Sequence, residues 1–168
     1  MKKIILSILF SIMCYIGYSQ TYICVSPAIT HDLGSILDKA NTSLEIGKQF
    51  DCTSIGFVVG RTTLNGNLVN NNYAEGHINT NVFQQGKWTN TITVGLGCVI
   101  SSTTNEYLLT EISSGIEYSY SEKIHFNFNG GQFNYSGVKT ASNSTYIAIS
   151  VAYYFKSYTP KSLISSKN

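Results

Sequence analysis

The chain has few charged residues and almost no proline. Asp, Glu, Lys and Arg make up 12% of its 168 residues, about half the share of a typical soluble globular protein. There are two prolines but twelve tyrosines. No basic cluster of the kind that binds nucleic acid is found, and no long helical period follows the N-terminus. These absences exclude a nucleic-acid-binding protein and favour a β-protein with little need for a charged surface.

The N-terminus has the pattern of a secretory signal. Lys2 and Lys3 precede an apolar run from Ile4 to about Ile16, and small residues follow it. We therefore expect export, with cleavage after Ser19. An uncleaved anchor is the alternative, but the run is short of the ~20 apolar residues of a membrane-spanning helix. Loss of two of the eleven basic residues would leave nine against nine acidic ones, so the mature chain would have no net charge.

Beyond the signal, apolar side chains alternate with small or polar ones. In Thr145–Phe155, Ile147, Ile149 and Val151 share one face, and the opposite face carries no charge. Such alternation is typical of strands with lipid on one side and a barrel interior on the other. It predicts seven strands, although the two faces of the third cannot be assigned: Ser43–Phe50, Thr53–Thr63, Tyr73–Gln84, Thr89–Ile100, Glu106–Tyr120, Ile124–Ser136 and Thr145–Phe155.

Tight and long connections alternate between these strands. The tight ones are Asp51-Cys52, Gln85–Lys87 and Ser121–Lys123, and the long polar ones are Leu64–Asn72, Ser101–Asn105 and Gly137–Asn143. Outer-membrane barrels have short periplasmic turns and long outer loops. This arrangement requires one more strand before Ser43, for which Tyr22–Thr30 is the candidate, although Pro27 is unwelcome in a closed ladder. The sequence thus predicts an all-β, eight-stranded antiparallel up-and-down transmembrane β-barrel with both termini in the periplasm.

Aromatic residues gather near the tight turns, where they would lie at the membrane–water boundary. They are Trp88, Tyr118, Tyr120, Tyr153 and Phe155.

Three cysteines follow the signal. Their odd number argues against a full disulfide framework. Cys24 and Cys52 would both lie near the periplasmic rim, so either one disulfide between them or no disulfide is expected. Cys98 should face lipid as a small hydrophobic residue.

Glu45, Glu111 and Glu117, with His125, are the polar residues expected inside the barrel. An eight-stranded barrel is just wide enough for its own side chains. The four residues could form a site for a cation or polar ligand, but a hydrated polar plug that fixes the register is favoured, because polar interiors are normal in such barrels. His77 is expected to be structural or interfacial. No catalytic residue, cofactor or metal ligand is predicted.

Enzymatic activity has one weak candidate, in the first outer loop. His31 and Asp32 could act as base and acid toward Ser35, but neighbouring residues rarely orient each other in this way. We therefore expect a protein that is not an enzyme.

The chain resembles the small outer-membrane β-barrel proteins of Gram-negative bacteria, and in particular a porin-type group. The resemblance covers roughly Leu44 to Phe155 and is strongest in Phe83–Gly97 (FQQGKWTNTITVGLG) and Gly115–Phe126 (GIEYSYSEKIHF). It implies insertion into the outer membrane by the assembly machinery, which often reads a C-terminal aromatic residue. Here Phe155 is followed by a Ser- and Lys-rich tail. Either Tyr153–Phe155 is read internally or the tail is a disordered extension, which its composition favours.

Taken together, we expect a signal peptide at 1–19, a barrel at 20–155 and a polar tail at 156–168. The expected function is that of a non-enzymatic membrane barrel with a filled lumen, acting structurally or through the loops Thr30–Thr42, Leu64–Asn72, Ser101–Asn105 and Gly137–Asn143. One alternative is a soluble, lipocalin-like barrel whose aliphatic faces line a cavity. A second is a lipid-modifying enzyme with its site at the loop rim.

Overall fold

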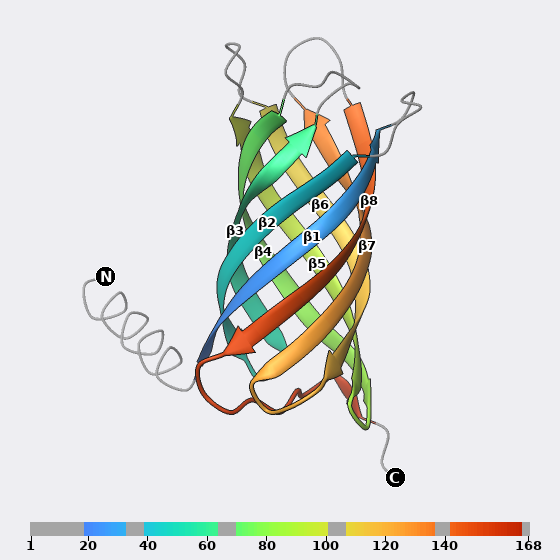
Figure 1. The fold of residues 1–168 in the computed structure, drawn as a ribbon. Coiled ribbons are helices and arrows are strands. Elements are labelled where there is room, and N and C mark those ends of the chain that lie inside the picture. The colour runs from blue at the N-terminus through green and yellow to red at the C-terminus, as the bar shows by residue number, and fades with distance from the viewer. Residues whose placement is uncertain (1–18, 33–38, 64–69, 101–106, 137–141, 166–168) are drawn as a thin grey trace, which may run out of the picture.

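Eight long strands follow one another along the chain and close into a barrel (Figure 1). A computed structural model describes residues 19–32, 39–63, 70–100, 107–136 and 142–165. The strands are β1 (Gln20–Asp32), β2 (Lys39–Phe50), β3 (Thr53–Thr63), β4 (Asn70–Gln85), β5 (Trp88–Ile100), β6 (Tyr107–Ser119), β7 (Ile124–Ser136) and β8 (Ser142–Tyr154), followed by the two-residue β9 (Ile164–Ser165). All eight predicted strands and the up-and-down order are confirmed.

The described residues contain no helix long and apolar enough to cross a membrane.

The barrel closes through β1, which pairs antiparallel with both β2 and β8. The pairing with β8 runs from Tyr22 opposite Tyr154 to Asp32 opposite Ser144. It passes from Val25 directly to Ala28, leaving out Ser26 and Pro27, because proline has no N–H to donate. The first strand therefore forms as the turn pattern required, and its proline costs only a local gap in the ladder.

The tight turns lie together at one end of the barrel, which we call the lower end. At β4–β5, Gly86 adopts a φ of 60°, a conformation that suits glycine in a short hairpin connection. At β2–β3, Asp51 has a φ of 41°. The predicted outer loops fall mainly on 33–38, 64–69, 101–106 and 137–141, which lie outside the described residues, as does the predicted signal up to residue 18.

Large apolar side chains cover the outside of the barrel, and small or polar ones fill the inside. In β5, Ile92, Val94 and Leu96 are exposed, whereas Thr91 and Thr93 are buried. The same division holds in β8, where Ile147, Ile149 and Val151 point outward. The lipocalin-like alternative is therefore wrong, because it places the aliphatic faces inside the barrel.

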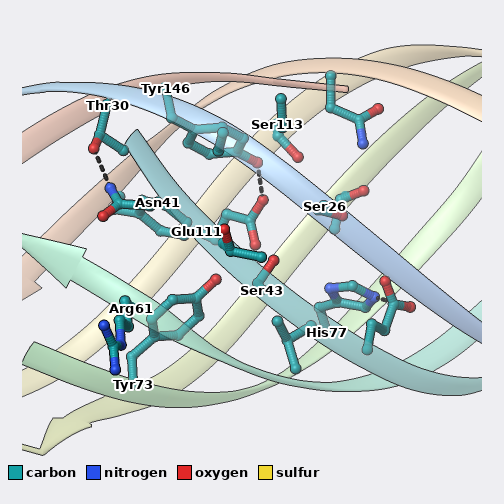
Figure 2. Close-up of a pocket in the computed structure, with 18 residues that line it drawn as sticks. Ser26, Thr30, Asn41, Ser43, Arg61, Tyr73, His77, Glu111, Ser113 and Tyr146 are labelled. Atoms are coloured by element: carbon teal, nitrogen blue, oxygen red, sulfur yellow. Dashed lines mark hydrogen bonds and ion pairs between the residues drawn. The ribbon is translucent and has the colours of Figure 1, made fainter. Parts of the chain in front are cut away.

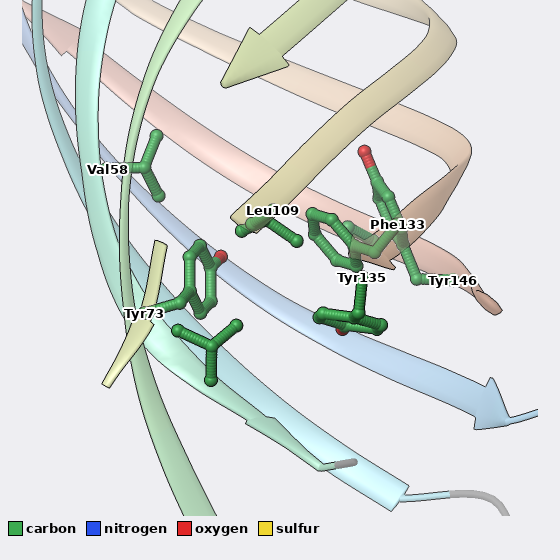
Figure 3. Packing of buried hydrophobic residues seen from close by; sticks show 8 residues of the cluster. Val58, Tyr73, Leu109, Phe133, Tyr135 and Tyr146 are labelled. Atoms are coloured by element: carbon green, nitrogen blue, oxygen red, sulfur yellow. The ribbon is translucent and has the colours of Figure 1, made fainter. Parts of the chain in front are cut away.

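The interior is layered along the barrel axis. An apolar cluster fills the upper half, with Phe133 stacked on Tyr146 at 4.6 Å between ring centroids (Figure 3). Its buried members are Val58, Tyr73, Val99, Leu109, Phe133, Tyr135, Tyr146 and Ala148. A second cluster, of Tyr22, Cys24, Ala152, Tyr154 and Tyr158, fills the lower end. Polar side chains occupy the space between the two clusters.

The C-terminal tail crosses the lower mouth of the barrel (Figure 1). We call residues 156–165 the C-terminal strap. The Tyr158 amide donates to the Glu122 carbonyl at 2.7 Å, and the Leu163 amide donates to the Asn81 carbonyl at 3.0 Å. The strap ends in β9, which pairs parallel with β4 at Phe83 and Gln84. The prediction of a disordered extension is therefore wrong for these residues, because composition does not reveal that Tyr158 has a buried place to fill.

Glycine allows the strands to approach each other closely at one inner position. A Cβ on Gly97 would lie 2.2 Å from the Ala74 carbonyl oxygen and 2.7 Å from the Glu75 Cα, so backbone atoms would have to move. Gly76, in contrast, is exposed and has nothing within 4 Å of such a Cβ.

We predict that Gly97→Ala lowers the free energy of unfolding by about 1–3 kcal/mol, the usual cost of overpacking. Gly76→Ala should be neutral or stabilise by up to about 1 kcal/mol, because alanine loses less backbone entropy on folding. Urea unfolding of the two variants in detergent micelles measures both effects. Equal stabilities would contradict this packing.

Candidate functional site

The polar layer inside the barrel is the candidate site. It contains four carboxylates, Glu45 on β2, Glu75 on β4, and Glu111 and Glu117 on β6. Two imidazoles lie among them, His77 on β4 and His125 on β7. All six have inward positions because they alternate with the outward aliphatic residues of their strands.

The first group in this layer joins Glu45, His77 and Tyr22. The Nε2 atom of His77 lies 2.9 Å from Oε1 of Glu45. The Tyr22 hydroxyl donates to the same carboxylate oxygen. Glu45 is thus held from two strands, and a Cβ on Gly56 would meet Glu45 Oε1 at 2.4 Å and His77 Nε2 at 2.6 Å. The absence of a side chain at Gly56 makes room for this pair.

The second group lies one layer higher. The Tyr146 hydroxyl donates to Oε1 of Glu111 (Figure 2). Glu75 is 1% exposed, and no donor among the described residues bonds to its carboxylate oxygens, which lie beside the Glu111 carboxyl. One ligand atom each from Glu75, His77 and Glu111 can be chosen so that all three lie within 4.8 Å of one another. A trio of two carboxylates and one imidazole is a potential metal-ion site.

The third group closes the lower end. The Nδ1 atom of His125 lies 2.8 Å from Oε1 of Glu117, and the His125 side chain is fully buried. Tyr154 packs against its ring at 4.7 Å and Tyr158 at 5.4 Å. Tyr154 and Tyr158 stack on each other at 4.5 Å. The C-terminal strap thus supplies a ring to the lower cluster.

Polar contacts hold the strap in place. The Nδ2 group of Asn81 donates to the Tyr158 hydroxyl at 3.0 Å and to the Lys161 carbonyl at 2.9 Å. Burial and then the Glu117 charge raise the pKa of Tyr158 above its usual value, so its phenol stays neutral over a wider pH range than that of an exposed tyrosine. The exposed Lys161 ammonium lies 2.6 Å from Oδ1 of Asp51, and this hydrogen bond followed by the Asp51 charge raises the pKa of Lys161.

Two small cavities lie between inward side chains of the described residues. The upper one is about 80 Å³ and is lined by Glu45, His77 and Glu111, among others (Figure 2). The lower one is about 50 Å³ and is lined by Glu45, His77 and Glu117, among others. The Glu45–His77 pair therefore lies between two spaces that have room for a few water molecules each.

The residues singled out in the sequence occupy different places in this layer. Glu45, Glu111, Glu117 and His125 all point inward, but the structure divides them among the three groups. His77, expected to be structural or interfacial, lies in the lumen. Sequence reasoning missed Glu75. The eight-strand topology offered a signal, because the alternation of inward and outward residues in the neighbouring strands could have been extended to β4.

The aromatic residues lie outside the barrel at its lower end. Trp88 packs against Tyr118 at 4.6 Å, and Tyr153 packs against Phe155 at 5.7 Å. Tyr120 lies edge-on to Phe126 at 6.1 Å. They form an outward-facing band near the tight turns.

The alternative disulfide is not present, because Cys24 and Cys52 are free thiols. Cys24 lies opposite Glu45 on β2, whereas Cys52 follows the end of β2 at Phe50. Five residues of strand at about 3.3 Å each separate those levels, which is more than a disulfide can span. Cys98 is exposed on the outer face.

His31 lies exposed near the upper end of β1, and Ser35 lies outside the described residues.

Solved structures of two bacterial proteins share this fold. One is the N-terminal β-barrel domain of OprF from Pseudomonas aeruginosa, with 12% identity, coverage of 80% of this chain and 99% of that chain, and a TM-score of 0.55. The other is Neisserial surface protein A, with 7% identity, coverage of 80% and 96%, and a TM-score of 0.55. This chain has the fold of a small outer-membrane β-barrel. No protein-family model and no curated protein matches its sequence, so the likeness is one of fold alone.

The strap lies across the mouth of the barrel at the end where the tight turns are. We predict that Tyr158→Ala lowers the free energy of unfolding by about 3–5 kcal/mol, as large-to-small changes at buried aromatic residues do. The variant loses the stacking on Tyr154 and His125 and the hydrogen bond from Asn81.

Leu163→Ala is the matched control, because Leu163 is on the same strap but exposed, and it should change stability by less than about 0.5 kcal/mol. Urea titration in micelles, followed by tryptophan fluorescence of Trp88, compares the two. If Tyr158→Ala is as stable as the control, the strap does not pack into the barrel.

Proposed function

We propose that this protein is an integral outer-membrane barrel, exported with a signal peptide cleaved after Ser19, with a structural or surface-interaction role rather than an enzymatic one. The observation that carries the proposal is the continuous apolar outer face of a closed barrel. Each strand from β1 to β8 contributes exposed large hydrophobic residues to it. Soluble proteins rarely expose so large a contiguous apolar surface to water, whereas a barrel that spans a bilayer needs one to contact the lipid.

The outer aromatic band supports an orientation. Trp88, Tyr118 and Tyr153 lie near the tight turns, where an aromatic girdle would meet the lipid headgroups. Short turns face the periplasm in barrels of this kind. The lower end, with both ends of the barrel domain and the strap, would then be periplasmic.

The filled lumen supports a role other than diffusion of solutes. Aromatic clusters occupy both ends of the interior, and the cavities between them are about 80 and 50 Å³. A polar layer held between two such clusters is well suited to fixing the strand register. We infer that the working surface lies outside the lumen, at the four outer loops.

Two kinds of partner follow from this proposal. The outer-membrane assembly machinery would insert the barrel, reading Tyr153–Phe155 where β8 ends and the strap begins. The loops would face the cell exterior, and one protein of the same fold is called a surface protein. No observation on the described residues favours an enzyme at the rim.

We expect the protein to pellet with outer membranes and to resist carbonate extraction. Its gel mobility should change on boiling in detergent, because a closed barrel stays folded in SDS until it is heated. N-terminal sequencing of the extracted protein should begin at Gln20. Recovery as a soluble monomer would overturn the membrane proposal.

A charge placed on the outer face should have an effect that depends on depth. Val94→Arg, in the middle of β5, should destabilise the barrel by about 2–4 kcal/mol in a bilayer. Ile100→Arg, at the end of the same strand and exposed to a similar extent, should cost about 0–1 kcal/mol near the interface. Reversible unfolding in lipid vesicles measures both, and equal costs would argue against a membrane centred on Val94.

A further inference from the structure

The carboxylates of the polar layer are short of positive partners. In the described part of the chain, the ion pairs formed by Glu45 and Glu117 are with His77 and His125. Glu111 accepts a hydrogen bond from the neutral Tyr146. No hydrogen-bond donor of the described residues reaches Glu75, whose carboxyl lies beside that of Glu111. A carboxylate enclosed in this way needs a counter-charge or a proton.

Glu75 points toward two other potential ligands. The side chains of Glu75, His77 and Glu111 bring ligand atoms within 4.8 Å of one another, a spacing that one ion at their centre can bridge. Glu75 is 1% exposed, and its oxygens receive no hydrogen bond from a described donor and lie beside a second carboxyl, that of Glu111, which is costly for a buried acidic group unless a proton or a cation binds there. A Cβ on Gly95 would lie 1.4 Å from Oε1 of Glu75, so this glycine leaves the space into which the carboxylate extends.

The surroundings hold two of these side chains in place. Glu111 is fixed by the Tyr146 hydroxyl, and that ring is stacked on Phe133 at 4.6 Å. His77 is held by Glu45, because its Nε2 atom lies 2.9 Å from Oε1 of that carboxylate. The Nδ1 atom of the same ring is then left for another partner. Metal-binding histidines typically use one ring nitrogen for the ion and the other for a carboxylate.

We propose that Glu75, His77 and Glu111 bind one divalent transition-metal ion, with Glu45 as the residue that positions the His77 ring. Two carboxylates neutralise a doubly charged ion, and carboxylate oxygen with imidazole nitrogen is a ligand set that suits Zn²⁺. The adjacent cavity of about 80 Å³, lined by His77 and Glu111, has room for a water molecule as the fourth ligand. The ion would cross-link β4 and β6 through the lumen.

The test uses the untagged mature barrel, refolded in micelles with ZnCl₂ and then passed over a chelating resin. Elemental analysis should find about one zinc per wild-type barrel. Glu75→Gln keeps the shape of the side chain but removes its charge, and zinc affinity should fall tenfold or more, because loss of even an outer-shell partner costs about 10–100-fold.

Glu117→Gln is the matched control, since Glu117 is a buried lumen carboxylate outside the trio, and it should retain zinc as the wild type does. The heat-dependent gel shift reports that each variant is folded. If Glu75→Gln does not fold, His77→Gln replaces it in the same comparison.

A zinc-free wild type would overturn the proposal and leave a proton shared between Glu75 and Glu111 as the explanation. Zinc retained in full by folded Glu75→Gln would overturn it as well. A second readout is Co²⁺ in place of zinc. Visible absorption from nitrogen and oxygen ligands should appear in the wild type and in Glu117→Gln and be lost in Glu75→Gln, which a purely structural role of Glu75 would not produce.

Discussion

The structure depends on one constraint, that the ladder of backbone hydrogen bonds must close on itself. A membrane interior offers no water to an unpaired N–H or C=O, so a sheet with free edges is excluded there. The pairing of β1 with β8 removes both edges at once. This requirement is strong enough to draw Pro27 into a strand, at the cost of a short interruption where its missing N–H would have been used. The meeting of β1 and β8, and with it the position of both ends of the barrel domain at one mouth, follows from closure.

Closure with eight strands leaves a narrow interior, and this determines how the polar residues are arranged. Several large inward side chains extend into space that a glycine on a neighbouring strand leaves free, as Gly95 does for Glu75 and Gly56 does for Glu45 and His77. Aromatic clusters occupy the two ends, so the polar groups between them are largely cut off from bulk water. In such a space a charge must be neutralised by an oppositely charged group of the protein, by a proton or by a bound ion. The distribution of residues is therefore the reverse of that in a soluble protein, with polar groups in the middle of the interior and apolar groups on the outer surface.

Much of the fold could be predicted from the sequence, because closure ties local patterns to global form. The period-two alternation in Thr145–Phe155 located a strand and its faces, and the alternation of turn lengths demanded β1, which propensity alone would have rejected. The features that were not predicted have no periodic pattern in the sequence. Glu75 escaped notice because the outward face of β4 is only weakly apolar, with Gly76 and Thr80 on either side of Ile78. The grouping of the acidic residues depends on the stagger between strands, which no single strand encodes. The strap was misjudged because its composition is that of a disordered segment, while its place depends on contacts with residues far away in the sequence, such as the burial of Tyr158 and the pairing of β9 with β4.

The strap has a consequence for the order of events during assembly. It leaves the end of β8 and attaches to β4, and these strands are four places apart in either direction around the barrel, so they lie on opposite walls. Until the first and last strands have met, those walls have no fixed separation, and the strap has no surface to span. The strap can therefore take up the position described here only when the barrel is closed. In that position it connects two opposite walls of the barrel across its lower mouth.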